Sequence, residues 1–433
     1  MPSLVDSQNG LVSARVFSDP ALYARELEMV FGRSWLFVAH ESEIPEPGDF
    51  VTRVMGEDPV IVCRDHEGQA RVMLNVCRHR GRKVCLEDAG SARTFQCGYH
   101  GWTYNEAGEL TGVPFFDAYG GKLDKPALGL QQAPRVASRF GLIFASWTED
   151  GPDLDEYLGE LGWILRILFA RTTCVEVAGP PQRWIVDANW KLGAANFSGD
   201  GYHLPTTHGY GVALGLDASR GQRLGFVLNT GQGHCAQMRY CPPGTIDVPP
   251  YLGLPEALWP DVRVRLSPEQ LEVMNSHLPY TGNVFPNMSF ICVATVGFLN
   301  TEYRGEGAGP ESPVSFLSVR QWQPKGPSHM EVWSWLLMDR DVSPAWKEAS
   351  KACYERAFGM AGMHEQDDVE NWSAITRSLH SPRASKVPLN YQMRLDASPS
   401  PEWRGPGKAY LYPTFSEINE RAFYQAWQDR VSA

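Results

Sequence analysis

The sequence predicts an α+β protein in which a small antiparallel β domain precedes a larger domain with helices covering an antiparallel sheet. Short β-rich runs separated by turns fill residues 38–150. A strong helix pattern opens at Ser343-Pro344 and runs toward residue 380. The strand candidates between these regions are residues 283–299, 314–323 and 330–339. We expect an N-terminal segment (1–37) that packs on the larger domain, a β domain (38–150) and the larger domain itself (151–433).

Composition and charge restrict the class of protein. The 433 residues are 43% hydrophobic and 11% aromatic, enough for two or three packed domains, and the net charge of −11 argues against a nucleic-acid binder. The N-terminus lacks the basic and apolar regions of a secretory signal. The most apolar helix candidate, Leu161 to Ala170, carries Arg166 and is too short to span a membrane. We therefore expect a cytoplasmic protein that binds neither nucleic acid nor membrane, with its nine cysteines as thiols or metal ligands.

The individual elements follow in chain order. Ser18-Asp19-Pro20 is a helix start, with Asp19 or Ser18 as cap and Pro20 in the first turn. In the β domain, residues 58–64 and 70–76 are strand candidates, and the turns include His66-Glu-Gly and Asn105-Glu-Ala-Gly. Residues 150–180 fit a linker plus a helix. A loop-and-helix region follows at 189–215.

Four residues of the β domain form a metal-binding pattern. Cys77-x-His79 is followed, after seventeen residues, by Cys97-x-x-His100. A zinc finger normally groups its cysteines in one half and its histidines in the other. One thiolate and one imidazole from each half instead suit a [2Fe–2S] cluster, with two cysteines on one iron and two histidines on the other. Cys85, between the two loops, is interpreted as a small packing residue.

A second metal pattern occupies the larger domain. His203 and His208 are five residues apart and so do not share a face of a regular helix, but Pro205 should break the helix and let both imidazoles converge. Two histidines and a carboxylate leave positions open for dioxygen in non-haem Fe(II) oxygenases. Residues 358–372 offer several carboxylates for the third position.

These motifs resemble a known family. Residues 75–104 resemble the Rieske ferredoxin signature, and residues 189–208 and 358–372 resemble the catalytic domain of aromatic-ring-hydroxylating dioxygenase large subunits of the naphthalene, biphenyl and polycyclic-hydrocarbon type. The resemblance implies a helix-grip catalytic domain. It also implies His203, His208 and Asp368 as ligands of a mononuclear Fe(II), with Asp367 as the alternative third ligand.

Two further residues receive roles from the same resemblance. Asn196 matches a residue beside the iron. Asp200 matches an aspartate that links a cluster histidine of one protomer, here His100, to an iron-ligating histidine of its neighbour, here His203. A buried carboxylate that accepts hydrogen bonds from two metal-bound imidazoles orients both of them.

The function implied by the resemblance is that of a terminal oxygenase. Electrons from NAD(P)H would arrive through a reductase, with or without a ferredoxin, and dioxygen would cis-dihydroxylate an aromatic ring. A homotrimer is implied, with or without a small β subunit. A Rieske monooxygenase or O/N-demethylase is the alternative with the same architecture, and a zinc-stabilised binding module is the alternative from another class.

Substrate-pocket and docking residues are hypotheses at this point. His364 shares a helix face with Asp368, where related enzymes usually have a large apolar residue, so we expect it to contact a polar substituent of the substrate. The other wall candidates are Phe197, Leu204, Val284, Phe285, Phe290 and Phe358. Basic residues crowd the cluster loops of this acidic chain and suggest a docking patch for an acidic ferredoxin. They are Arg78, Arg80, Arg82, Lys83 and Arg93.

Overall fold

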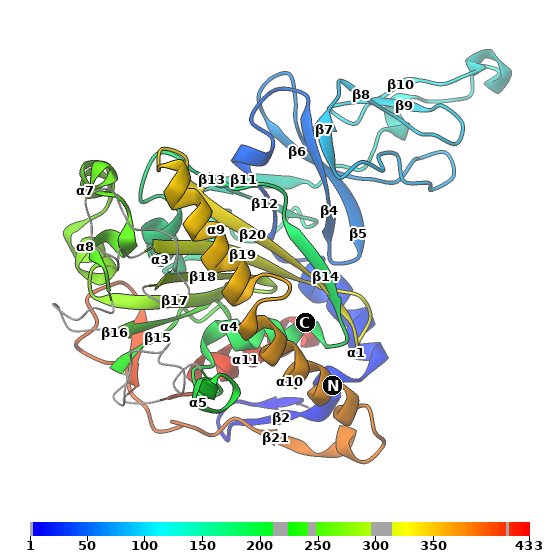
Figure 1. Ribbon diagram of the computed structural model, residues 1–433. Coiled ribbons are helices and arrows are strands. Elements are labelled where there is room, and N and C mark those ends of the chain that lie inside the picture. The colour runs from blue at the N-terminus through cyan, green and yellow to red at the C-terminus, as the bar shows by residue number, and fades with distance from the viewer. Residues whose placement is uncertain (1–2, 211–223, 241–247, 296–313, 413–414) are drawn as a thin grey trace. The chain divides into compact units, whose positions relative to one another are not determined.

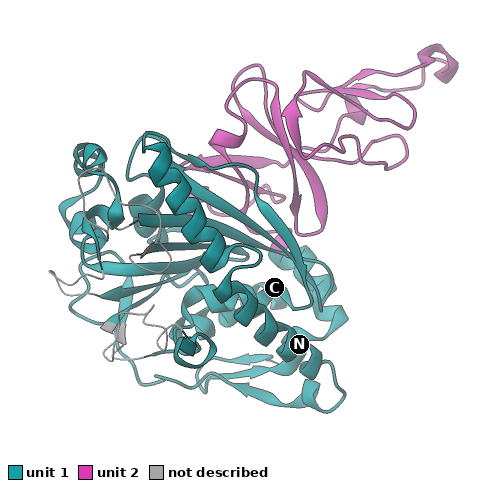
Figure 2. Ribbon diagram, viewed as in Figure 1, with its two compact units in different colours: residues 1–30, 157–433 teal, residues 31–156 magenta. Residues whose placement is uncertain are grey.

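The computed structural model describes residues 3–210, 224–240, 248–295, 314–412 and 415–433 (Figure 1). The chain divides into two compact units (Figure 2). Unit 1 comprises Met1–Val30 and Tyr157–Ala433, and unit 2 comprises Phe31–Glu156. Unit 2 thus extends beyond the expected limits of 38 and 150, because the strand Leu36–His40 pairs with a strand inside it.

Unit 2 contains three antiparallel sheets, with strand orders β6-β5-β4-β7, β10-β9-β8 and β11-β12-β3. The first sheet consists of β4 (Asp49–Met55), β5 (Asp58–Arg64), β6 (Ala70–Leu74) and β7 (Ala89–Ser91). The second consists of β8 (Thr94–Gln96), β9 (Thr103–Asn105) and β10 (Leu110–Gly112). The third consists of β3 (Leu36–His40), β11 (Arg135–Arg139) and β12 (Leu142–Ser146). The loop 75–83 follows β6, and the loop 97–102 connects β8 to β9. Each cluster loop therefore begins at the end of a strand.

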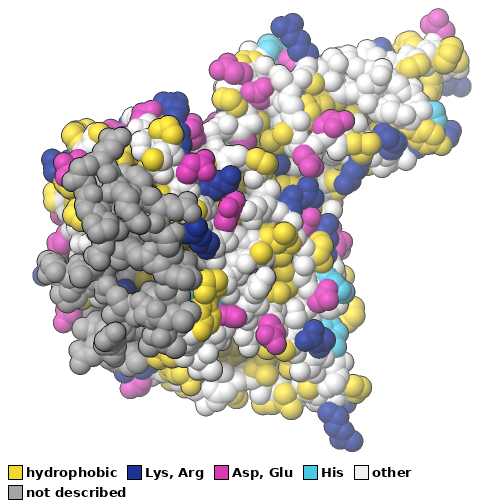
Figure 3. Space-filling model, viewed as in Figure 1, with side chains coloured by type: hydrophobic (Ala, Val, Ile, Leu, Met, Phe, Trp, Pro, Cys, Tyr) yellow, Lys and Arg dark blue, Asp and Glu magenta, His cyan; other side chains and the backbone are white. Residues whose placement is uncertain are grey.

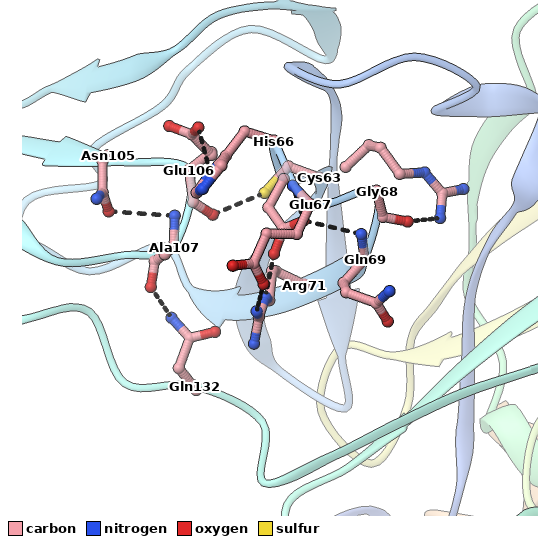
Figure 4. A network of polar contacts seen from close by, with 12 residues as sticks. Cys63, His66, Glu67, Gly68, Gln69, Arg71, Asn105, Glu106, Ala107 and Gln132 are labelled. Atoms are coloured by element: carbon pink, nitrogen blue, oxygen red, sulfur yellow. Dashed lines mark hydrogen bonds and ion pairs between the residues drawn. The ribbon is translucent and has the colours of Figure 1, made fainter.

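Polar contacts tie two hairpin turns of unit 2 together at the strand ends away from those loops (Figure 4). The Cys63 thiol donates to the Glu106 carbonyl at 3.2 Å, and His66 Nδ1 lies 3.1 Å from the Glu106 carboxylate. The Gln132 side chain donates to the Ala107 carbonyl at 3.0 Å. Because the turns after β5 and β9 are joined, β6 and β9, the strands next to the two cluster loops, are held in a fixed relation.

Unit 1 is built on an antiparallel sheet of nine strands within its described residues, in the order β13-β20-β19-β18-β17-β16-β15-β22, with β14 also pairing with β20. These strands are β13 (Val175–Val177), β14 (Gln182–Val186), β15 (Leu224–Asn229), β16 (Cys235–Tyr240), β17 (His277–Val284), β18 (Met288–Thr295), β19 (Val314–Pro324), β20 (Met330–Asp339) and β22 (Lys408–Tyr412). A small sheet joins β1 (Val5–Asp6), β2 (Leu11–Ser13) and β21 (Pro388–Asn390).

The predicted strand 283–299 is wrong at its start. Val284 ends β17, and β18 begins only at Met288, so residues 285–287 form the turn of a hairpin. Proline supplies no backbone N–H for a strand ladder, which explains why pairing stops around Pro286. Residues 296–299 lie outside the described residues. The predictions 314–323 and 330–339 agree with β19 and β20.

Helices lie against both faces of this sheet. The α-helices in the described part of the chain are α1 (Pro20–Glu26), α2 (Leu154–Leu158), α3 (Leu161–Phe169), α4 (Trp190–Gly199), α5 (Leu204–Thr207), α7 (Trp259–Arg265), α8 (Pro268–Met274), α9 (Pro344–Phe358), α10 (Met363–Leu379) and α11 (Ile418–Ser432). Phe316 of β19 contacts Tyr354 of α9, and Trp322, on the same face of β19, contacts Phe197 of α4. Phe290 of β18 is paired with Val319 on the opposite face and contacts Phe169 of α3. Figure 1 shows α9 lying across the sheet.

The single helix predicted from Ser343 toward residue 380 is two helices. Ser343 caps α9 by accepting from the Trp346 N–H, but α9 ends at Phe358 and α10 starts at Met363. A Cβ on Gly362 would lie 2.6 Å from the Ala357 carbonyl group, so only glycine allows this close return of the backbone. The break gives α10 a direction of its own, and α10 carries the carboxylates expected at the second metal site.

The N-terminal segment is anchored in unit 1 by a buried ion pair. Asp19 caps α1, and Glu26 at the end of this helix pairs with Lys191 of α4, with 2.5 Å between Oε1 and Nζ. The indole N–H groups of Trp190 and Trp427 also donate to the Glu26 carboxylate, each at 2.9 Å. One carboxylate therefore joins α1, α4 and α11.

Two surface properties bear on partners. In the described part of the chain, no helix combines the length and apolar character needed to cross a bilayer. On the face seen in Figure 3, acidic and basic side chains are interspersed, and its described part has no continuous basic patch.

Candidate metal centres

The two loops of the predicted cluster site repeat one backbone hydrogen-bond pattern. The Cys77 N–H donates to the Arg82 carbonyl at 2.8 Å, and the Cys97 N–H donates to the Trp102 carbonyl at the same distance. Gly81 and Gly101 each donate to the carbonyl of the preceding cysteine at 2.9 Å, with φ of +76° and +73°. Left-handed backbone of this kind favours glycine, so each loop is a rigid turn that presents one cysteine and one histidine.

The four side chains of these loops fit an iron–sulfur cluster. Cys77 and Cys97 are buried free thiols, and the His79 and His100 rings lie 4.5 Å apart between centroids. His79 stacks on Trp102 at 4.9 Å, which fixes its ring plane. Its Nδ1 atom is buried and has no hydrogen-bond partner among the described residues. A buried nitrogen without a partner is costly unless a metal uses its lone pair.

Tyr104 adds a contact that the motif did not reveal. Its hydroxyl accepts the Arg78 N–H at 3.0 Å and lies 3.4 Å from the Cys77 sulfur, to which its own proton can be donated. Burial and the neighbouring Cys77 thiol raise the pKa of Tyr104, so the phenol keeps that proton. A hydrogen bond to a ligating sulfur stabilises the reduced form of a cluster and raises its potential.

The second group of predicted ligands comes together in unit 1. His203 and His208 flank the short helix α5, and Asp368 lies on α10. The candidate ligand atoms of these three residues all lie within 4.8 Å of one another. The Asp368 Oδ1 atom is 3.4 Å from His203 Nε2 and 3.3 Å from His208 Nε2.

The role expected for Pro205 is wrong in one respect. Pro205 lies in the first turn of α5 and does not break a helix. The position suits proline because the first turn needs no intrahelical N–H donor. The imidazoles converge because His203 and His208 stand just before and just after a helix of a single turn.

The charges of this group are strongly coupled. Burial acts to raise the pKa of Asp368, but the two imidazoles prevail and lower it to about 2. Burial acts to lower the pKa of His203, yet Asp200 and Asp368 raise it to about 10. A buried carboxylate that faces two imidazole nitrogens favours a positive charge between them. A divalent cation fits that place.

Asp367 and Asp200 lie behind the two histidines. Asp367 Oδ2 is 3.2 Å from His208 Nδ1, the nitrogen turned away from Asp368. Asp200 Oδ2 is 3.5 Å from His203 Nδ1, while Asp200 Oδ1 accepts the N–H groups of Tyr202 and His203 at 3.0 and 3.3 Å. Asp368 thus faces the inner nitrogens, Asp367 contacts the outer nitrogen of His208 and can orient it, and Asp200 lies near the outer nitrogen of His203.

The wall candidates divide into two groups. The Phe358 ring lies 6.2 Å from Phe197 and 5.2 Å from His364, and the His364 ring lies 4.7 Å from His208. Phe197, Phe358 and His364 therefore line the same site. Asn196 on α4 precedes Phe197 in the sequence, and Leu204 on α5 follows His203. Both side chains are half-buried.

The other three wall candidates, Val284, Phe285 and Phe290, have no ring contact with these residues in the described part of the chain. Phe290 was expected in this wall but contacts Phe169 on the opposite face of the sheet. Phe285 lies in the hairpin turn, where its ring contacts Phe423. Val284 is buried at the end of β17. The strand pattern misplaced Phe290 because alternate residues of a strand point to opposite faces.

Sequence reasoning also missed three polar residues around the site. Arg320 is fully buried, pairs with Glu365 and donates to the Phe358 carbonyl, which joins β19 to both sides of the α9–α10 break. The Tyr210 hydroxyl lies 2.8 Å from His364 Nδ1. A charged residue within a buried strand is the one signal that marked Arg320. Tyr210 had no comparable signal.

Known proteins share both parts of the chain. Residues 34–132 match the model of the Rieske [2Fe-2S] domain, and residues 312–433 match that of the ring hydroxylating alpha subunit (catalytic domain). The N,N-dimethyl phenylurea N-demethylase subunit alpha of Sphingobium sp. (strain YBL2) is 36% identical, covering 96% of this chain and 91% of that protein. The biphenyl dioxygenase subunit alpha of Paraburkholderia xenovorans (strain LB400) is 35% identical, covering 99% and 92%.

A solved structure gives the same result. The naphthalene 1,2-dioxygenase from Rhodococcus sp., solved with bound indole, superposes with a TM-score of 0.89 at 42% identity. The match covers 97% of this chain and 94% of that one. The likeness therefore extends over both units and over nearly the whole length of the relatives.

Proposed function

Because this chain belongs to the family of Rieske-type aromatic-ring-hydroxylating dioxygenase alpha subunits, we propose that it is a terminal oxygenase that adds both atoms of dioxygen to an aromatic ring. The resemblance found in residues 75–104, 189–208 and 358–372 is confirmed, and so are the α+β fold and the oxidoreductase class. The cofactors of the family, a Rieske [2Fe–2S] cluster and a mononuclear iron, are those expected from the motifs. The product of the proposed reaction is a cis-dihydrodiol.

We assign the cluster to Cys77, His79, Cys97 and His100, and the mononuclear iron to His203, His208 and Asp368. When bound, the cluster supplies electrons one at a time, and the iron supplies the coordination positions at which dioxygen is activated. The observation that carries the proposal is the meeting of two imidazole nitrogens and one carboxylate oxygen within 4.8 Å. Asp367 keeps His208 oriented through its outer nitrogen.

The apolar side chains of the site have a separate task. Phe197 and Phe358 offer ring faces against which a flat arene can lie. Their contact with each other, and the contact of Phe197 with Trp322, hold them in place. A dry pocket keeps water away from activated oxygen, so that the aromatic ring is the group that reacts.

The electron donor is a ferredoxin or a reductase linked to NAD(P)H, which favours a cytoplasmic location. Family members take electrons from such proteins. Arg78, Arg80, Lys83 and Arg93 are exposed on or near the cluster loops, and Arg82 is half-buried. We assign these residues to the docking of an acidic donor, since complementary charge increases the rate of encounter.

The assembly that fits this function is a homotrimer, with or without a small β subunit. In a trimer, Asp200 of one protomer would face His100 of its neighbour and connect the two metal centres between chains. Asp200 retains 31% of its side-chain exposure in the described chain, so its carboxylate is accessible to a partner. Equilibrium sedimentation of the purified protein tests this assembly, and a fully active monomer would exclude it.

N-demethylation is a second candidate reaction, favoured by one observation. The demethylase subunit from Sphingobium covers nearly all of this chain at 36% identity. The same two metal centres serve both outcomes, so the pocket decides between them. Demethylation inserts one oxygen atom and releases formaldehyde from an N-methyl group.

Labelled dioxygen distinguishes the two reactions. Purified protein is combined with a ferredoxin and reductase, NADH and either naphthalene, biphenyl or an N,N-dimethyl phenylurea. We expect a cis-dihydrodiol that contains two labelled oxygen atoms from an arene. A single labelled atom, or formaldehyde from the phenylurea with no arene product, would assign the chain to the monooxygenase branch.

A further inference from the structure

One buried arginine reaches both sides of the break between α9 and α10. Arg320, on β19, has a side-chain exposure of 0%. Its Nη1 atom pairs with the Glu365 carboxylate in the first turn of α10, and its Nη2 atom donates to the carbonyl of Phe358, the last residue of α9. The guanidinium therefore bridges a stretch of backbone, residues 359–362, that lies outside both helices.

The two ends of this bridge belong to different parts of the proposed oxygenase site. Phe358 is a proposed wall of the arene pocket, and Glu365 lies three residues before the proposed iron ligand Asp368, on the same side of α10. The guanidinium carbon of Arg320 is 5.3 Å from the centre of the Phe358 ring and 5.2 Å from that of Phe197, the other wall ring. The spacing between the wall and the helix that carries the ligand therefore depends on this one side chain.

Other contacts hold the two helices on the sheet without this arginine. The Tyr354 hydroxyl of α9 donates to Ser334 of β20 at 2.7 Å. Trp372 of α10 packs against Trp322 of β19, with 5.4 Å between the ring centres. A buried ion pair is by itself a weak source of stability, because the attraction between its charges is offset by the loss of their hydration. Arg320 instead restrains the two helix ends that face the site.

We propose that Arg320 is a positioning residue that sets the distance between the arene-binding wall and the iron, and so decides which bond of the arene is oxidised. In this role Arg320 touches neither the substrate nor the metal and acts through Phe358 and Glu365. The planar guanidinium fork serves two acceptors at once, whereas the single ammonium group of a lysine cannot hold both in the same geometry. The inference rests on the proposed function, because it concerns regiochemistry in the same pocket.

The distribution of products from one arene tests the proposal. Biphenyl offers two kinds of edge on each ring, so cis-dihydroxylation gives a 2,3-dihydrodiol or a 3,4-dihydrodiol. In Arg320→Lys we expect the minor product to rise about fivefold relative to the major one, since small displacements of reacting groups change rates strongly. The ratio depends only on the molecules that turn over, so a lower yield of folded enzyme does not alter it. An unchanged ratio would overturn the inference.

Two further variants separate positioning from general loosening. The double variant Arg320→Met with Glu365→Leu removes the bridge without leaving a buried charge, and apolar replacements of this kind usually keep a protein folded. It should shift the biphenyl products as Arg320→Lys does. Arg171→Lys is the matched control, because Arg171 is also fully buried and donates twice to a buried carboxylate.

The control acts at a different place in the fold. Its partner Asp339 is on the face of β20 opposite to Ser334, the residue paired with Arg320. Arg171→Lys should therefore lower the stability of the protein and keep the biphenyl ratio. An equal shift of the ratio in this control would refute the positioning role, because any loosening of the core would then suffice.

Binding without turnover separates this inference from the proposed reaction. Dissociation constants of naphthalene and phenanthrene are measured on the iron-loaded enzyme without dioxygen. In Arg320→Lys the released Phe358 ring yields to the larger arene, so the affinity for phenanthrene relative to naphthalene should rise about fivefold. Iron content should stay at the wild-type level, and its loss in the double variant would overturn the inference, because a positioning role leaves the metal in place.

The outcomes for the two proposals differ. A shifted affinity ratio with no oxidised arene would keep the role of Arg320 and refute the proposed reaction. Oxidised arenes with both ratios unchanged in Arg320→Lys and in the double variant would keep the reaction and refute the role. A wild-type protein that binds neither arene would refute both.

Discussion

His203 and Asp368 are 165 positions apart in the sequence, yet His203 Nε2 lies 3.4 Å from Asp368 Oδ1. The neighbouring Asp367 instead contacts the outer nitrogen of His208. Two adjacent carboxylates on α10 thus have different surroundings, which allows their roles to be separated by substitution.

We expect Asp368→Ala to lose the mononuclear iron and retain the cluster. Iron content should fall from about three to about two atoms per chain, since the cluster holds two. Asp367→Asn should retain the third iron after purification but release it faster on dialysis, because an outer partner of a metal-bound histidine tunes affinity by about ten- to a hundredfold. Metal analysis measures both, and the reverse pattern would make Asp367 the ligand.

Three cysteines lie in or between the cluster loops, and we assign Cys77 and Cys97 to iron. Cys97→Ser should abolish the visible absorption and the reduced-state EPR signal of the cluster. Cys85→Ala should keep both, because the backbone of Cys85 is held by Asn75 through hydrogen bonds of 2.7 and 2.9 Å that need no thiol. Loss of the signal in Cys85→Ala at normal yield of folded protein would contradict the assignment.

Charge reversal in the basic loop should slow electron delivery. Lys83→Glu and Arg80→Glu are expected to lower the second-order rate of reduction by ferredoxin about tenfold at low salt, and the difference should vanish at high salt. Stopped-flow reduction of the cluster measures this rate. Lys351→Glu, an exposed change of the same kind on α9, is the control. A salt-independent rate in all variants would argue against steering.

The buried pair of Glu26 and Lys191 should be costly to break on one side only. Lys191→Met leaves a buried carboxylate with two indole donors but no cation, and we expect a loss of about 3–5 kcal/mol in unfolding free energy. The double variant with Glu26→Gln should recover part of that loss. Urea unfolding followed by tryptophan fluorescence measures both. Equal stability of the single and double variants would show that the uncompensated charge is not the cause.

His234 should make the protein less stable in acid. It is fully buried, accepts the Phe285 N–H at 2.9 Å, and burial, followed by Arg430, lowers its pKa to about 3. The unfolded imidazole binds its proton below about 6.5, so stability is lost as the pH falls through the window between these two values. From about pH 7.5 to about pH 5, the wild type should lose about 2 kcal/mol more than His234→Gln. Urea midpoints at both pH values measure the difference, and equal losses would contradict it.

The sequence was most informative where the chemistry is local. Each cluster loop places a cysteine, a histidine and a glycine within five consecutive residues, so the ligands and the turn that presents them are readable together. The strands β5, β19 and β20 were predictable because apolar runs end at clear turns. Ring-hydroxylase motifs then supplied the family, which the comparisons confirm.

Long-range partners were not predictable from one sequence. In the sequence, Arg320 is only a charged residue within the apolar run of β19. Its partner Glu365 comes 45 positions later, on α10. The Tyr210–His364 contact spans 154 positions. The break at Gly362 was missed because apolar periodicity resumes in α10 and hides four non-helical residues. Such features depend on which surfaces meet after folding, and residue spacing does not contain that information.

The helical turn between His364 and Asp368 also limits which bond of a bound substrate can react. A regular helix rises about 5.4 Å per turn and does not stretch, so the backbone positions of His364 and of the proposed iron ligand Asp368 keep a constant separation. A substrate whose polar substituent contacts His364 would present one particular edge to the metal, and the bond attacked would be decided by its distance from that substituent. Moving the histidine by a turn would relocate the attack along the ring system, while a change of pocket volume alone would not.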